Sequence, residues 1–208
     1  MTAAYYLKDI RAHEPAEYYD LLCKNTNFSW QASGWESEED QYGRFLLTSS
    51  VIKKESSVLD VGCGQGDLYS FLKERMSNSN SSFNYHGIDV SPKMIEAARS
   101  KYSEANFSCD DFLNLKEDQK YDHVFALGTF SLRAEDQDSY IKSCVSKCFR
   151  LTRHTCTITV TSETSDIKYD EIFYYKVADI ARIASSLSKK IVINTASSPC
   201  EIILTLYN

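Results

Sequence analysis

The chain has 208 residues, of which 43% are hydrophobic and 25% charged, and its formal net charge is −6 at pH 7. This length suits about one domain, and the composition is typical of a soluble globular protein. The acidic balance does not favour nucleic acid as a partner. No apolar run is long enough to span a membrane, so we expect no membrane partner.

The seven cysteines are odd in number, and none lies in a C-x-x-C pair. Cys144 and Cys148 fall on one side of an expected helix, but they lack further Cys or His ligands at metal-site spacing, so we expect no metal. Buried thiols in a reducing compartment are the simpler interpretation. We therefore expect a cytoplasmic location.

The first fifty residues predict two helices joined by a polar, aromatic connection at 25–36. Pro15 suits the first turn of a helix over 14–24. Ser37 is placed as the N-cap of the second helix, with acidic residues in its first turn and Asp40 in a capping-box position. The expected apolar face of this second helix consists of Tyr42, Phe45, Leu46 and Ile52.

Residues 55–71 predict a strand, a glycine turn and a helix. A short apolar run at 58–61 suits a buried strand and ends in three alternating glycines, Gly62, Gly64 and Gly66. Apolar residues then recur at helical spacing. Glycines in such a turn allow a ligand to approach the backbone, and the first N–H groups of the helix point toward that ligand.

A second acidic strand end follows at 85–89. Asp89 is placed to accept hydrogen bonds from a ribose diol. Ser91 and Pro92 then predict the cap and the start of a helix that runs to about Lys101. Two neighbouring strand ends of this kind form one nucleoside site.

These residues resemble class I S-adenosylmethionine-dependent methyltransferases. The matching motifs are Val58-Leu59-Asp60-Val61-Gly62-Cys63-Gly64-Gln65-Gly66-Asp67-Leu68, and Gly87-Ile88-Asp89-Val90-Ser91-Pro92 followed by Met94-Ile95-Glu96-Ala97-Ala98. Dinucleotide-binding Rossmann proteins carry G-x-G-x-x-G, which this glycine spacing does not reproduce. The resemblance implies S-adenosylmethionine as cofactor, in contact with Asp60, Gly62, Cys63, Gly64, Gly66, Asp67, Leu68, Asp89, Val90, Ser91 and Met94.

The N-terminal region extends this resemblance. Gly34-Trp35 and Gln41-x-x-Arg44-Phe45 are similar to a pattern in a compact group of class I methyltransferases from bacteria and phages, which implies that Trp35, Gln41 and Arg44 bind the cofactor. Arg44 either pairs with the methionyl carboxylate or is a surface arginine. Trp30 and Trp35 are either packing anchors or walls of a substrate pocket.

A third strand at 106–109 ends in two adjacent acids. In the family, an acid at this strand end accepts from the adenine amino group and the next residue packs on the ring. Asp111 followed by Phe112 fits this pattern best, and Asp110 is the alternative.

The fourth strand, at 121–127, ends in a loop that a doubly wound fold places beside the transferable methyl. The resemblance therefore adds Leu127, Gly128 and Phe130 to the cofactor contacts. The loop lacks the Asp/Asn-Pro-Pro-Tyr/Phe motif of adenine methyltransferases, and no Pro-Cys pair is placed for cytosine attack. Candidates for the substrate pocket are Trp30, Trp35, Thr129, Phe130, Arg133 and Tyr174.

The remaining pattern predicts a helix at 139–151, a strand at 156–161 with one more polar face, a helix at 177–188, and short strands at 191–194 and 202–207. The expected fold is α/β and doubly wound, with a seven-stranded, mostly parallel sheet, and the resemblance implies that its last strand is antiparallel. We expect a single domain over 1–208, in which a helical cap at 1–54 precedes a Rossmann-like core at 55–208.

The predicted function is methyl transfer from S-adenosylmethionine to an O, N or S nucleophile of a small molecule. The alternatives are a protein or nucleic-acid methyltransferase with a partner subunit, and an inactive cofactor-binding subunit. His86 and His123 lie in predicted strands and are expected to be satisfied core or edge residues. His13 and His154 lie near element ends, and no catalytic base is assigned.

Overall fold

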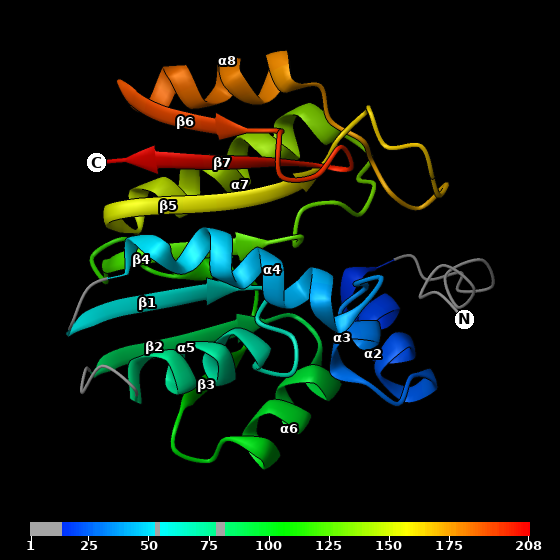
Figure 1. Cartoon of the computed structure of the whole chain (residues 1–208), viewed down its shortest axis with the longest axis vertical. Helices are drawn as coiled ribbons and strands as arrows, with labels where there is room; N and C mark the ends of the chain where they lie inside the picture. The colour runs from blue at the N-terminus through cyan, green and yellow to red at the C-terminus, as the bar shows by residue number, and fades with distance from the viewer. Residues whose placement is uncertain (1–13, 53–54, 78–81) are drawn as a thin grey trace. The chain divides into compact units, whose positions relative to one another are not determined.

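The computed structural model describes residues 14–52, 55–77 and 82–208. His13 lies outside these ranges. The chain divides into two compact units, Met1–Phe112 and Leu113–Asn208. Each unit carries its own set of strands and helices (Figure 1).

The first unit contains three parallel strands in the order β3-β2-β1: β1 (Ser56–Val61), β2 (Phe83–Asp89) and β3 (Asn106–Cys109). Helix α5 (Asp67–Ser77) follows β1, and α6 (Pro92–Lys101) follows β2 and packs on β2 and β3. The apolar run of β1 is fully buried, as are Leu68 and Leu72 on α5. The predicted strand, turn and helix are confirmed.

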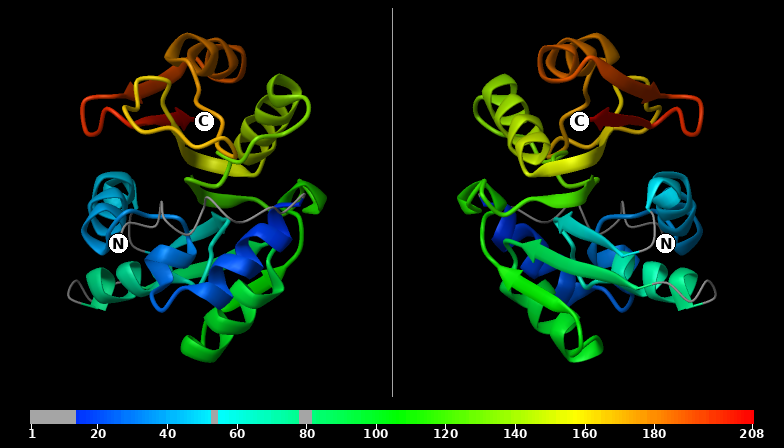
Figure 2. Two further views of the ribbon diagram at one scale, coloured as in Figure 1. Left: turned by 90° about the vertical axis from the view of Figure 1, so that its right-hand side faces the viewer. Right: turned by 90° about the vertical axis from the view of Figure 1, so that its left-hand side faces the viewer.

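The N-terminal part of this unit is helical. It consists of α2 (Pro15–Asn25), the short α3 (Ser29–Ala32), α4 (Glu38–Thr48) and the 3₁₀ turn η1 (Ser49–Val51). Helix α2 lies beside α6 in both views of Figure 2. Ser37 is the N-cap of α4, since its Oγ accepts from the Asp40 N–H at 3.1 Å, as predicted. The sequence did not predict α3, which has four residues and no side-chain cap.

The buried face of α4 differs from the prediction. Gln41, Arg44 and Phe45 are buried, whereas Tyr42 and Leu46 are 51% and 49% exposed. The apolar pattern was misleading because α4 directs a polar side chain, Gln41, toward the start of α5. Tyr42 still contacts α5 with one ring edge.

The second unit contains four strands in the order β4-β5-β7-β6: β4 (Tyr121–Leu127), β5 (Thr152–Thr161), β6 (Lys190–Asn194) and β7 (Glu201–Tyr207). Strands β4 and β5 are parallel, and β7 is antiparallel to both of its neighbours. Helix α7 (Gln137–Arg150) packs on β4 and β5, and α8 (Val177–Leu187) packs on β6 and β7. Thr157 and Thr159 are buried, so the polar face of β5 does not face solvent.

The predicted fold class is confirmed: seven strands, mostly parallel with an antiparallel last strand, alternate with helices in an α/β fold. In the part of the chain that the structure describes, no helix has the length and apolar character needed to cross a membrane.

Candidate active site

The glycine turn after β1 adopts a conformation that side chains rarely tolerate. Gly62, Gly64 and Gly66 have φ angles of 72°, 53° and 85°. The N–H of Gly62 donates to the carbonyl of Ile88 at 2.8 Å, which joins the turn to the end of β2. A Cβ on Gly66 would meet the Phe107 ring at 2.9 Å. The turn therefore needs glycine both for its backbone angles and for space.

A Cβ on Gly64 would meet the hydroxyl oxygen of Ser33 at 2.8 Å. Ser33 is the C-cap residue of α3, so the N-terminal region approaches the glycine turn directly. The space beside Gly64 is taken by a flexible side chain of this chain.

Asp89 is buried at the end of β2 and is held by backbone N–H groups. Its Oδ2 accepts from the N–H of Gly64, and its Oδ1 accepts from the N–H of Ser91, both at 2.9 Å. Burial raises the pKa of Asp89, and hydrogen bonds from Ser91, Gly64 and Val90 oppose this shift. Each carboxylate oxygen has a further lone pair, so this fixed carboxylate fits a ribose diol.

A second buried carboxylate, Asp60, lies on β1. The phenol of Tyr85 donates to its Oδ2 at 2.6 Å. Burial raises the pKa of Asp60 to about 7, and the charges of Asp89 and Asp67 act in the same direction. Three acidic residues around one turn create a negative potential, which fits a cofactor that carries a sulfonium and an ammonium group.

Helix α4 supplies two of the predicted residues. Gln41 donates from Nε2 to Oδ2 of Asp67 at 3.0 Å, so the structure brings this predicted pair together. Arg44 is buried, which is contrary to the interpretation of a surface arginine. Its pairing with a methionyl carboxylate stays a prediction.

The two tryptophans contact neighbouring aromatic rings. Trp35 packs edge-on against Phe45, with ring centroids 6.5 Å apart, and Trp30 stacks on Phe28 at 5.9 Å. Both tryptophans are half-buried, which is compatible with packing anchors and with pocket walls.

The start of α6 has the predicted cap. The Oγ of Ser91 accepts from the N–H of Met94 at 3.1 Å. Met94, Leu68 and Cys63 are buried, while Val90 is half-buried. Burial raises the pKa of the Cys63 thiol well above its ordinary value, with further contributions from the charges of Asp60 and Asp89.

The end of β3 carries the two candidate adenine acceptors. The N–H of Asp110 donates to the carbonyl of Asp89 at 3.1 Å, and the N–H of Asp111 donates to Oδ1 of Asp110 at 2.7 Å. Both acidic residues are exposed, and Phe112 is buried at the start of η2 (Phe112–Asn114). The choice between Asp110 and Asp111 stays a prediction.

The sequence did not indicate four residues that lie at this site. They are Tyr19, Asp20 and Cys23 on α2, and Ser33. Asp20 accepts a hydrogen bond from Ser91, which lies 71 residues later in the sequence. Gln65 donates a hydrogen bond to Cys23, which lies 42 residues earlier in the sequence. Burial, and then the charge of Asp89, raise the pKa of Tyr19. These contacts depend on the tertiary fold, and no local pattern indicates them.

In the second unit, the loop after β4 is held by Thr159 of β5. Gly128 has a φ of 77°, and its N–H donates to Oγ1 of Thr159 at 2.8 Å. Phe130 is fully buried and packs edge-on against Tyr140. Leu127 and Thr129 are half-buried. Their roles toward cofactor and acceptor stay predictions.

Arg133 binds the segment that precedes α8. Its Nε donates to the carbonyl of Asp170 at 3.0 Å, its Nη2 donates to that of Ile172 at 3.1 Å, and its guanidinium lies over the Phe173 ring. The phenol of Tyr174 accepts from the N–H of Tyr169 at 2.9 Å. Arg133 thus orders an aromatic segment of this unit, and contact with an acceptor stays a prediction.

The histidines in the strands are satisfied core residues, as predicted. His86 bonds Ser108 and His123 bonds Thr155, both at 2.7 Å. His154 is exposed and lies 3.7 Å from Asp122. Within the described ranges, no group of three or more His, Cys, Asp or Glu residues is placed to hold a metal ion.

Comparison with known proteins supports the class of methyltransferases that the sequence motifs indicate. Residues 58–154 match the family model described as a methyltransferase domain. A malonyl-[acyl-carrier protein] O-methyltransferase of Acetivibrio thermocellus is 39% identical over 80 residues, which are 38% of this chain and 27% of the relative. A trans-aconitate 2-methyltransferase of Rhizobium rhizogenes is 28% identical over 105 residues, 49% of this chain and 40% of the relative. The chain thus spans well under half the length of these curated relatives.

Among solved structures, the magnesium protoporphyrin IX methyltransferase of Synechocystis PCC 6803 with bound SAM has a TM-score of 0.61 and 16% identity. The match covers 99% of this chain and 89% of that structure. The fold is therefore that of class I methyltransferases, and residues 58–154 match the methyltransferase-domain family model. The resemblance predicted from the glycine turn and Asp89 is confirmed.

Proposed function

We propose that this protein binds S-adenosylmethionine and transfers its methyl group to a small-molecule O, N or S nucleophile. The observation that carries the proposal is the Asp89 carboxylate, held by the N–H groups of Gly64 and Ser91 beside the glycine turn. This arrangement offers a fixed acceptor for a ribose diol in a domain that matches methyltransferases.

The residues of the first unit would hold the cofactor in distinct ways. Asp89 binds the ribose, Asp67 favours the cationic groups, and the buried Arg44 binds the methionyl carboxylate. Asp111 or Asp110 accepts from the adenine amino group while Phe112 packs on the ring. When bound, S-adenosylmethionine supplies an electrophilic methyl group. The protein binds and orients the reactants and excludes water, which in favourable cases lowers the barrier by about 7 to 11 kcal/mol.

The acceptor is proposed to be small. The net charge of −6 opposes a polyanionic substrate, and relatives that match parts of the chain are named for acids and acyl carriers. Trp30, Trp35, Thr129, Phe130, Arg133 and Tyr174 remain the candidate pocket residues. A cytoplasmic location is part of the proposal, since an odd number of cysteines without a C-x-x-C pair favours a reducing compartment.

The test is methyl transfer from S-adenosylmethionine labelled in its methyl group to a panel of carboxylates, phenols, thiols and amines. Labelled product with one acceptor class, lost in Asp89→Ala, is the expected result. Cofactor binding without transfer to any acceptor would favour the inactive binding subunit instead. Transfer only to protein or nucleic acid would contradict the small-molecule proposal.

A further inference from the structure

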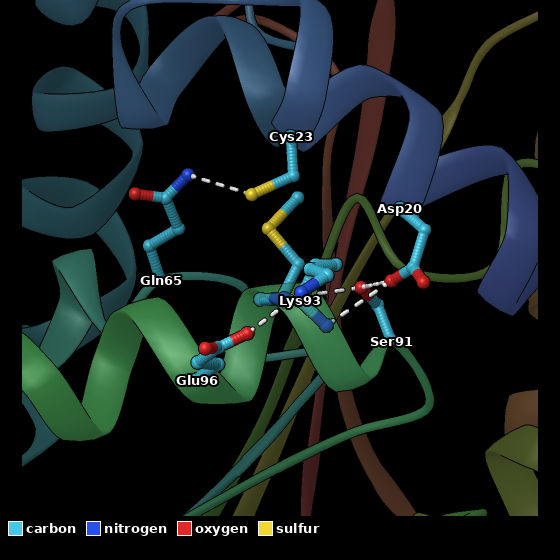
Figure 3. Close-up of polar contacts among 7 residues, drawn as sticks. Asp20, Cys23, Gln65, Ser91, Lys93 and Glu96 are labelled. Carbon is cyan, nitrogen blue, oxygen red and sulfur yellow. Dashed lines mark hydrogen bonds and ion pairs between the residues drawn. The ribbon is translucent and has the colours of Figure 1, made fainter.

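One face of helix α2 contacts both loops of the nucleoside site, which are the glycine turn after β1 and the loop between β2 and α6. Asp20 and Cys23 are three residues apart, so they share a side of the helix. In Figure 3, Asp20 points toward Ser91 and Lys93 at the start of α6, and Cys23 points toward Gln65 of the glycine turn. Ser91 donates from Oγ to Oδ1 of Asp20 at 2.6 Å, and the N–H of Lys93 donates to the same oxygen at 3.1 Å. Gln65 donates from Nε2 to the sulfur of Cys23 at 3.5 Å.

The Asp20 contact continues to the ribose acceptor through one residue. Ser91 uses its hydroxyl hydrogen for Asp20 and its backbone N–H for Oδ1 of Asp89. The other oxygen of Asp89 accepts from the N–H of Gly64. A continuous chain of hydrogen bonds therefore joins α2, the N-cap of α6, the buried carboxylate and the glycine turn.

Asp20 also accepts a backbone N–H group at the start of α6. The first N–H groups of a helix have no partner within the helix, and Asp20 accepts one of them, that of Lys93, from outside. A negative charge at this end of a helix is favourable. The Lys93 ammonium is engaged elsewhere, with Glu96 at 2.9 Å, so it does not neutralise Asp20 directly.

We propose that Asp20 is a positioning residue of the nucleoside site. It fixes Ser91 so that Asp89 faces the ribose, and it couples the docking of α2 to occupation of that site. This inference rests on the proposed function, because it assigns Asp20 a role in binding the nucleoside of S-adenosylmethionine. Asp20 acts through Ser91 and is not assigned a contact with the cofactor.

The test compares three variants of the full chain by calorimetric titration with S-adenosylhomocysteine and with adenosine. Asp20→Ala should bind both ligands about tenfold more weakly, since a hydrogen bond to a charged group is lost. Asp20→Asn should stay within about threefold of the wild type, because its amide oxygen can accept from Ser91 and Lys93. Glu17→Ala is the matched control, since it removes an exposed acid from the same helix.

A purely structural role for Asp20 predicts a different pattern. It would lower the melting temperature of Asp20→Ala and leave both dissociation constants unchanged well below that temperature, which would overturn the inference. Equal losses of ligand affinity in Asp20→Asn and Asp20→Ala would also overturn the inference. Hydrogen exchange gives a second measure: S-adenosylhomocysteine should protect the α2 amides of the wild type and of Asp20→Asn, but not those of Asp20→Ala.

The same titration separates this inference from the proposed function. A wild-type protein that is folded but binds neither ligand contradicts the function itself. A wild type that binds both, with an Asp20→Ala variant that matches Glu17→Ala, contradicts only the role of Asp20.

Discussion

Asp89→Asn tests the nucleoside site because the side chain keeps its shape and loses its charge. Both carboxylate oxygens of Asp89 accept backbone N–H groups, one from Gly64 and one from Ser91. Asparagine has one acceptor oxygen and an NH₂ group, so one of these two N–H groups faces a donor. The ribose also loses an ionised acceptor.

The two effects of this substitution act on different quantities. A hydrogen bond to a charged group contributes about 1.5 to 3 kcal/mol, so affinity for S-adenosylhomocysteine should fall by about 10- to 150-fold. In the free protein, one buried N–H left without an acceptor costs about 1 to 3 kcal/mol. Removal of a buried charge, whose pKa burial raises, offsets this cost. Stability should therefore change less than binding.

The assay is calorimetric titration of Asp89→Asn with S-adenosylhomocysteine, accompanied by thermal unfolding. Asp118→Asn, which alters an exposed acid in the second unit, is the control and should match the wild type. A folded Asp89→Asn protein whose dissociation constant stays within twofold of the wild type would refute the assignment of Asp89 to the ribose.

Three further predictions concern neighbouring residues. Gly64→Ala should lower the free energy of unfolding by about 1 to 2 kcal/mol in urea titrations, because its φ of 53° is strained for any side chain; an unchanged midpoint would contradict this. Arg44→Ala should weaken the binding of S-adenosylhomocysteine about tenfold, but not that of adenosine, in calorimetric titration. Equal losses of affinity for both ligands would argue against a carboxylate partner. Burial raises the pKa of Asp60 to about 7, so the native state retains a proton that the unfolded state releases. The free energy of unfolding should therefore fall as pH rises from about 4 to 7, by on the order of 4 kcal/mol. Asp60→Asn should remove that part of the pH dependence when urea midpoints at pH 5 and 8 are compared, and an unchanged slope would refute the cause.

The parts of the fold that depend on neighbouring residues could be predicted from the sequence. The caps Ser37 and Ser91 bond residues three positions away, and the glycine turn follows directly from the end of β1. Two short apolar runs that flank a turn with Pro199 predicted the last two strands, and the family resemblance implied that the last one is antiparallel. Local chemistry is enough at these places, because each element carries its own start and stop signals.

The parts that depend on tertiary contacts could not be predicted. Tyr42 and Leu46 have the spacing of a buried face, yet α4 buries Arg44 and Gln41, and Gln41 bonds Asp67 at the start of α5. Asp20 has no local feature that indicates its bond to Ser91. Such polar contacts follow from how helices dock, and the periodicity of one segment does not contain that information.

The central claim is that this chain binds S-adenosylmethionine at the glycine turn and Asp89. Its most direct test is calorimetric titration of the purified wild-type protein with S-adenosylmethionine and, separately, with S-adenosylhomocysteine. The account predicts one site per chain for each ligand, with micromolar affinity. Absence of binding of both ligands to the folded protein would contradict it.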